Sequence, residues 1–180
     1  MTQEPRPTQE WRGRFLEDFA IGDVYRSRLG RTISEADNTW FTLLTMNTNQ
    51  IHFNREFASQ TEFGAPLVVS SLTLAIVLGL SVSDTSENAL ANLGWTDIRL
   101  PSPVFAGDTL WAESEILAVR ESQSRPSCGI VTVRTRGLCQ RGEVVIEFGR
   151  SFIVFKRDAP DVNRAFPATA APWLVDGEPT

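Results

Sequence analysis

Residues 70–81 read SSLTLAIVLGLS and lie within the longest apolar run of the chain. Gly64 and Pro66 break the chain before this stretch, and we expect a helix from Ser70 to about Ser81. The helix is apolar on nearly every face, which predicts that the rest of the chain covers it all round. Polar residues interrupt the run too often for a membrane span.

The remainder of the chain is dominated by strands. Runs of β-forming residues between turn signals predict strands at 24–33, 91–100, 108–120, 129–140 and 143–156. The short turn at Arg141-Gly142 indicates that the last two strands form an antiparallel hairpin. Strands in succession favour an α+β fold, in which a curved antiparallel sheet wraps around the buried central helix. The open edges of such a sheet favour pairing with a second copy.

A second helix is expected to begin at Ser34. Ser34 and Asp37 form a weak capping box, which satisfies the first free amides of a helix. The helix carries one apolar stripe, formed by Ala36, Trp40, Leu43 and Leu44. The helix is expected to end within residues 45–49, where Asn and Thr favour local side-chain-to-backbone hydrogen bonds over helix continuation. A further helical turn is predicted at 54–58, capped by Asn54.

Composition indicates one soluble globular domain. Of the 180 residues, 42% are hydrophobic and 22% charged, and the net charge of −5 argues against binding to nucleic acid or anionic membranes. We expect a flexible tail at 1–14, a single domain at 15–157 with Phe15, Phe19 and Ile21 as its first anchors, and a C-terminal tail at 158–180. Trp173 and Leu174 are candidates to pin that last tail back. The N-terminus has no apolar signal-peptide core, so we expect a cytoplasmic protein.

Metals and cofactors are not expected. Cys128 and Cys139 match neither a disulfide framework nor a zinc signature, and the chain has one histidine. We interpret both cysteines as buried structural thiols.

The single histidine, His52, is the only side chain here suited to proton transfer near neutral pH. It lies in the polar stretch Asn47-Thr48-Asn49-Gln50-Ile51-His52. The spacing alone leaves two readings open, a catalytic group and a hydrogen-bonded structural histidine. If the preceding helix ends near Met46, the chain can double back and bring Asn47 and His52 to one pocket.

The start of the buried helix is a second candidate. The first amides of a helix, here at Ser70 and Ser71, have no intrahelical partner and can hold a developing oxyanion in a dry site. Plain capping by the Ser70 hydroxyl is the alternative. We interpret Asp97, Arg99 and Asp108 as charged residues at solvent-exposed strand ends. Four further arginines have two possible roles, contact with a ligand or a place on a solvent-exposed face of the sheet: Arg120, Arg134, Arg136 and Arg150.

These pieces together resemble the MaoC-like (R)-specific enoyl-CoA hydratases, which have the hot-dog fold. In that family a helix ends in Asp-x-Asn-Pro-x-His, followed by Phe-Gly and a buried helix. The matching segments here are residues 47–52, Phe63-Gly64 and the helix from Ser70, with Pro103-Val104 and Gly107-Asp108-Thr109-Leu110 downstream. The resemblance extends over about residues 15–155.

The resemblance implies reversible addition of water to a 2-enoyl-CoA thioester by a homodimer or higher even oligomer. His52 matches the catalytic histidine, Ser70 the residue whose amide holds the thioester oxygen, and Asn49 a supporting asparagine. We also expect Ser71 and Gly64 at the substrate. Asn47 stands where the family has its catalytic aspartate, and an amide cannot take up a proton.

Our hypothesis is that His52 transfers the proton while Asn47 positions water. The sequence of residues 45–53 resembles that of the family branch that acts on small branched or dicarboxylic acyl-CoAs, such as mesaconyl- or itaconyl-CoA. The alternatives are a non-catalytic hot-dog subunit that binds acyl-CoA or supports a partner, and a hot-dog thioesterase.

Overall fold

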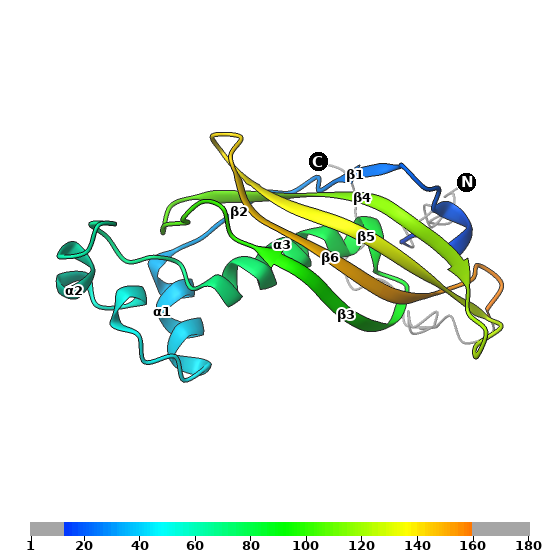
Figure 1. The fold of residues 1–180 in the computed structure, drawn as a ribbon, viewed down its shortest axis with the longest axis horizontal. Helices are drawn as coiled ribbons and strands as arrows, with labels where there is room; N and C mark the ends of the chain where they lie inside the picture. Colours follow the sequence, from blue (N-terminus) through cyan, green and yellow to red (C-terminus); the bar gives the residue numbers. More distant parts are fainter. Residues whose placement is uncertain (1–12, 160–180) are drawn as a thin grey trace, which may run out of the picture.

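Helix α3 (Ser70–Thr85) lies against one face of a single antiparallel sheet in the computed structural model, which describes residues 13–159 (Figure 1). The sheet order is β1-β4-β5-β6-β3, and β2 pairs with β4 off this path. The strands are β1 (Val24–Arg26), β2 (Arg31–Thr32), β3 (Ala89–Arg99), β4 (Thr109–Glu121), β5 (Cys128–Cys139) and β6 (Val144–Phe155). The α+β architecture and the final hairpin are confirmed. The tails expected at 1–14 and 158–180 fall mostly outside the described residues.

The core lies between α3 and the sheet. Leu72 and Val77 of α3 join a buried cluster with Leu110 of β4 and with Ile146 and Phe148 of β6. Burial alternates along much of β5, as a strand with one face on a core requires. The free cysteines Cys128 and Cys139 are both buried, as predicted.

Helix α3 is longer than expected and is not covered all round by residues 13–159. Leu72, Val77 and Ser81 face the sheet and are buried, whereas Ala75, Gly79 and Val82 on the opposite stripe are exposed. A sheet on one side of a helix can cover only one stripe of it. The open side of α3 therefore forms one wall of a groove.

The single strand predicted at 24–33 is wrong, since the structure divides it into β1 and β2. The N–H of Ser27 donates to the oxygen of Ala112 (2.9 Å), and the Ser27 hydroxyl accepts from the Ala112 N–H (2.9 Å). A side chain thus replaces one bond of the ladder. Gly30 then lies against the Trp111 ring, where any side chain would overlap the indole.

The anchors of the lead-in are partly confirmed. The short 3-10 helix η1 (Leu16–Asp18) has Phe15 and Phe19 buried on either side. Ile21 is 69% exposed and is not an anchor. The turn that follows is held to β4, because the Gly22 N–H donates to the oxygen of Ile116 (2.9 Å).

Helix α1 (Glu35–Leu44) begins as predicted but presents an unexpected face to the core. Ser34 and Asp37 make both bonds of the capping box. The apolar stripe faces away from the core, with Trp40 77% and Leu44 80% exposed. The buried residues of α1 are polar, Asn38 and Thr42. Within residues 13–159 the stripe is left uncovered.

The interpretation of Asp108 as a solvated strand end is wrong, although Asp97 and Arg99 are exposed. Asp108 is 5% exposed and accepts bonds from the Phe105 N–H (3.0 Å), Gln140 Nε2 (2.6 Å) and Arg141 Nη1 (2.9 Å). Burial alone would raise the pKa of this carboxyl. The three donors outweigh burial and hold the pKa below its usual 3.8.

Asp108→Asn is expected to lower the free energy of unfolding at neutral pH by about 1–3 kcal/mol, because one acceptor oxygen becomes a donor. A carboxyl with a depressed pKa stabilises the fold above its unfolded pKa, and this stability is lost as the pH falls through the folded pKa. The difference between wild type and variant should therefore shrink in acid. Urea unfolding at neutral and acidic pH measures it, with Glu62→Gln, at an exposed loop position, as the control. A pH-independent difference would contradict the prediction.

The arginines left open by the sequence have different roles. Arg134 and Arg136 form cross-strand ion pairs with Glu115 and Glu113 on the exposed sheet face, as a wet face predicts. Arg120 is exposed. Arg150 is only 5% exposed, and its Nη2 donates to Thr85 Oγ1 (2.9 Å) and Ser86 Oγ (3.2 Å) at the end of α3. Burial lowers the pKa of Arg150 to about 10.

No helix in the described part of the chain combines the length and hydropathy that a membrane crossing needs. Residues 13–159 also contain no group of three His, Cys, Asp or Glu side chains placed to hold a metal ion.

Candidate active site

The chain turns sharply where α1 ends. The Met46 N–H donates to the oxygen of Leu43 (3.0 Å) and the Asn47 N–H to that of Thr42 (3.0 Å), the pair of bonds of a Schellman motif. Met46 takes the left-handed conformation (φ 57°) that this motif usually gives to glycine. The predicted end of the helix near Met46 is confirmed, and the turn sends residues 47–52 back along the molecule.

Two asparagines shape the loop that follows. Asn47 Oδ1 accepts from the Asn49 N–H (3.0 Å), and Asn49 Oδ1 accepts from the Ile51 N–H (3.3 Å). Asn49 is thereby the cap of the 3-10 helix η2 (Gln50–His52), which agrees with a supporting role. Asn54 caps helix α2 (Arg55–Ser59) as predicted. The amide of Asn47 bonds within its own turn and makes no hydrogen bond to His52.

His52 is half-buried and is tied to the segment that leads into α3. Its Nδ1 lies 3.0 Å from the carbonyl oxygen of Leu67. A carbonyl oxygen only accepts, so Nδ1 carries the proton of the neutral ring and Nε2 keeps a free lone pair. The backbone repeats the link, since the Leu67 N–H donates to the oxygen of Ile51 (3.1 Å). His52 is therefore held in the tautomer that a general base requires.

Asn38 of α1 holds these segments together, and the sequence analysis did not single it out. Its Nδ2 donates to the carbonyl oxygens of His52 (2.7 Å) and Leu67 (2.9 Å), and its Oδ1 accepts from the Val69 N–H (2.9 Å). Asn38 is 3% exposed, so its side chain is shielded from water, and its bond to Val69 is fully buried. The available signal was an asparagine, a poor helix former, in the interior of a predicted helix.

The N-terminus of α3 lies directly beyond this network. Val69 is its N-cap and makes no side-chain cap bond, so the alternative in which the Ser70 hydroxyl caps the helix is wrong. The N–H groups of Ser70 and Ser71 have no hydrogen-bond partner within residues 13–159, as the first amides of a helix predict. Both residues are exposed. The α3 terminus thus offers two free donors and partial positive charge three residues beyond Leu67.

The structure links only some of the predicted site residues to one another by hydrogen bonds. His52 bonds to Leu67, and Asn38 joins both residues to Val69, the residue before Ser70. Asn47 and Asn49 shape the loop that carries His52. Gly64 lies on an exposed turn after α2, with φ +67°, and its N–H bonds the oxygen of Thr61 (3.1 Å). None of its contacts joins it to His52.

Chemically, the arrangement combines one proton-transfer group with a helix N-terminus that can hold negative charge. The chain is an α+β protein whose one histidine is tied to the segment before its central helix, and three comparisons agree with this fold class. A family model described as "MaoC like domain" matches residues 18–137. The mesaconyl-CoA hydratase of Cereibacter sphaeroides is 37% identical over 169 residues, which cover 91% of this chain and 49% of that protein.

Solved structures agree on the architecture. A MaoC-like dehydratase from Rhodospirillum rubrum superposes with a TM-score of 0.71 at 33% identity, covering 81% of this chain and 99% of that one. A Mycobacterium tuberculosis protein described as having a double hotdog fold superposes with a TM-score of 0.74 over 89% of this chain and 53% of its own; at 20% identity it shows the fold alone. The fold is the hot-dog fold, and the chain belongs to the MaoC-like family. It spans about half the length of the first curated relatives that it matches.

Proposed function

We propose that this chain adds water reversibly across the 2,3 double bond of a small enoyl-CoA. The observation that carries the proposal is the bond from His52 Nδ1 to Leu67 O (3.0 Å), which leaves Nε2 free to act as a base and ties His52 to the segment that leads into α3. The relatives named mesaconyl-CoA hydratase and beta-methylmalyl-CoA dehydratase favour a branched or dicarboxylic acyl group.

The proposed step uses one proton carrier. His52 Nε2 takes a proton from water while the water oxygen bonds to C3, and the electrons of the double bond move toward the thioester oxygen. The Ser70 amide, with that of Ser71 beside it, stabilises the negative charge on that oxygen. His52 then returns the proton to C2 on the same face, so the net change is addition of one water. Asn47 orients the attacking water.

The direct test is an assay of the purified chain with short enoyl-CoAs, including mesaconyl-CoA and itaconyl-CoA. We expect loss of the conjugated enoyl thioester absorbance and formation of a hydroxyacyl-CoA. A chain that hydrates none of them, and whose acyl-CoA affinity is unchanged in His52→Ala, would instead fit a non-catalytic hot-dog subunit. Asn47, in place of the family aspartate, is the observation that favours this second candidate.

Asn47→Ala is expected to lower kcat at least about tenfold, because the substitution removes both the group that orients water and the acceptor of the Asn49 N–H. Asn47→Asp keeps the acceptor and adds a second group able to take up a proton, so we expect it to retain turnover and change the pH profile. The measurement is kcat against pH. Thr48→Ala, at an exposed neighbour, is the control. Wild-type turnover in Asn47→Ala would make Asn47 a bystander.

We also propose that the chain pairs with a second copy through β3. Among the described strands β3 pairs only with β6, so one of its edges is open. Leu93, Trp95 and Ile98 of this strand are 52%, 43% and 44% exposed. An open apolar edge strand is a pairing site. Light scattering after size exclusion tests the pairing, and a monomer at all concentrations would refute it.

A further inference from the structure

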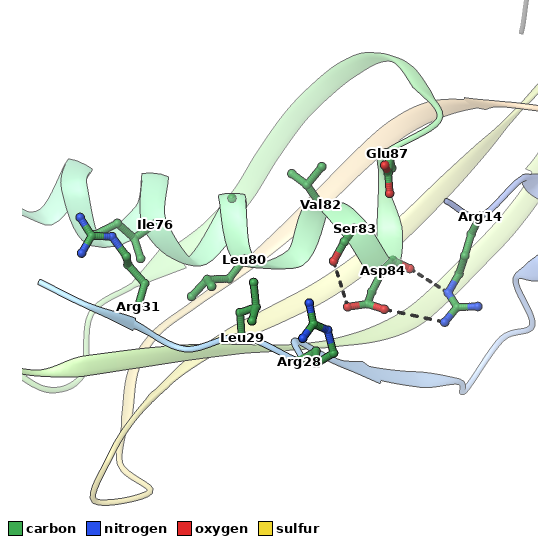
Figure 2. A pocket seen from close by; sticks show the side chains of 11 residues that line it. Arg14, Arg28, Leu29, Arg31, Ile76, Leu80, Val82, Ser83, Asp84 and Glu87 are labelled. Atoms are coloured by element: carbon green, nitrogen blue, oxygen red, sulfur yellow. Dashed lines mark hydrogen bonds and ion pairs between the residues drawn. The ribbon is translucent and has the colours of Figure 1, made fainter. Parts of the chain in front are cut away.

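A groove of about 900 Å³ runs between the open side of α3 and the segment from β1 to β2, residues 24–32 (Figure 2). Its volume falls in the usual range of small-molecule sites, roughly 300–1,000 Å³. The groove lies at the β1 and β2 edge of the sheet, whereas the proposed pairing strand β3 is at the other edge. Its lining includes neither residues 47–52 nor the first turn of α3, so it shares no residue with the candidate active site.

The middle of the groove is apolar. Leu29 of the β1–β2 segment is 58% exposed, and it lines the groove together with Ile76, Leu80 and Val82 of α3 (Figure 2). Gly79 leaves the helix side open, because a side-chain carbon at this position would meet no atom within 4 Å. From Ile76 to Val82 the helix rises about 9 Å. The lining therefore suits an apolar chain of medium length.

One cation stands at the end of this apolar lining. Arg28 lies between the lining and Arg14 (Figure 2). Arg14 pairs with Asp84 (3.8 Å), and Arg31, at the other end, pairs with Asp37 (2.9 Å). Arg28 is exposed and makes no hydrogen bond or ion pair within residues 13–159, so its charge is not matched by the described part of the chain. An occupant should therefore be apolar over most of its length and negatively charged where it meets Arg28.

We propose that this groove binds a linear aliphatic carboxylate of medium chain length, such as octanoate. The carboxylate meets the Arg28 guanidinium, whose fork of N–H groups suits two parallel hydrogen bonds to a carboxylate. The alkyl chain lies along the apolar lining from Leu29 to Ile76. The reverse orientation is disfavoured, because it would place the carboxylate where Asp37 already pairs with Arg31.

The test is calorimetric titration of the full chain with octanoate, below the concentration at which the acid forms micelles. Affinity should rise from butanoate to octanoate by up to about fourfold for each methylene, the value for a fully buried methylene. Octanol, which has the same chain without the charge, should bind about fivefold more weakly than octanoate. Arg28→Gln should weaken octanoate binding about fivefold and leave octanol binding unchanged. Arg120→Gln, at an exposed arginine outside the groove, is the matched control.

Gly79→Leu tests the groove itself. Leucine fills the open space beside α3 and favours the helix, so the variant should stay folded, as thermal unfolding can check, and should lose octanoate binding.

Three outcomes would overturn the proposal. Wild type that does not bind octanoate would leave the groove without this ligand. Equal affinities of Arg28→Gln and Arg120→Gln would remove the role of Arg28. Binding that survives Gly79→Leu would place the acid elsewhere on the chain. All of these readouts measure binding rather than catalysis, so they do not depend on the proposed function.

Discussion

His52→Ala is expected to reduce kcat/KM for the best enoyl-CoA by about 10²–10⁴-fold, the usual contribution of a positioned acid–base group. The chain has no second histidine that could replace it. Among the described residues the His52 side chain makes one hydrogen bond, to Leu67 O, so the loss should fall mainly on kcat rather than on folding. Steady-state kinetics and thermal unfolding, measured on the same preparation, separate the two effects.

Added imidazole sharpens the test of His52. The truncated side chain leaves a space beside Leu67 O, and we expect free imidazole to restore part of the turnover of His52→Ala. Gln50→Ala is the matched control, since Gln50 lies in the same 3-10 turn and, within residues 13–159, its side chain bonds only to Asn54, accepting from Asn54 Nδ2 (2.6 Å). Turnover of His52→Ala within a few-fold of wild type would refute the proposed proton carrier.

Asn38→Asp is expected to have the largest effect on stability, with a loss of about 3 kcal/mol or more in the free energy of unfolding. A carboxylate cannot donate to the carbonyl oxygens of His52 and Leu67, so two buried acceptors would face an oxygen. The same change frees the segment that orients His52. In the fraction that remains folded, we expect kcat to fall further than KM changes.

Thr42→Val is the matched control for Asn38. Thr42 is fully buried on the same face of α1, one turn later, and its hydroxyl has no hydrogen-bond partner in the described chain. Removal of an unsatisfied buried hydroxyl should leave stability unchanged or raised. Denaturant unfolding measures both variants. Equal behaviour of Asn38→Asp and Thr42→Val would show that the three bonds of Asn38 contribute little, and wild-type kcat in Asn38→Asp would remove its positioning role.

The capped ends of the elements could be predicted because their signals are local. The capping box of Ser34 and Asp37, the cap at Asn54 and the turn at Arg141-Gly142 each depend on atoms a few residues apart. The Schellman turn at Met46 was anticipated only as a helix end. The division of the strand at 24–33 was missed, because it depends on Ala112 and Trp111, which are far away in the sequence.

The candidate site was half predictable. The single histidine could be selected because of its side-chain chemistry. The free amides could be selected because they begin the apolar helix. The link between them was not predictable, because Asn38 is 14 residues from His52 and 31 from Val69, and its bonds exist only once α1 has docked. Until then an asparagine within a helix is an ordinary polar residue.

The sequence by itself determined that this chain packs an apolar helix against an antiparallel sheet and that His52 is its one side chain suited to proton transfer near neutral pH. Only the tertiary structure decided that α1 turns Asn38 inward and its apolar stripe outward, and that α3 is covered on one side. The physical reason is that periodicity defines which residues share a face. Which face is buried depends on the partners available, and for α1 the three hydrogen bonds of the buried Asn38 side chain hold the polar face against the core.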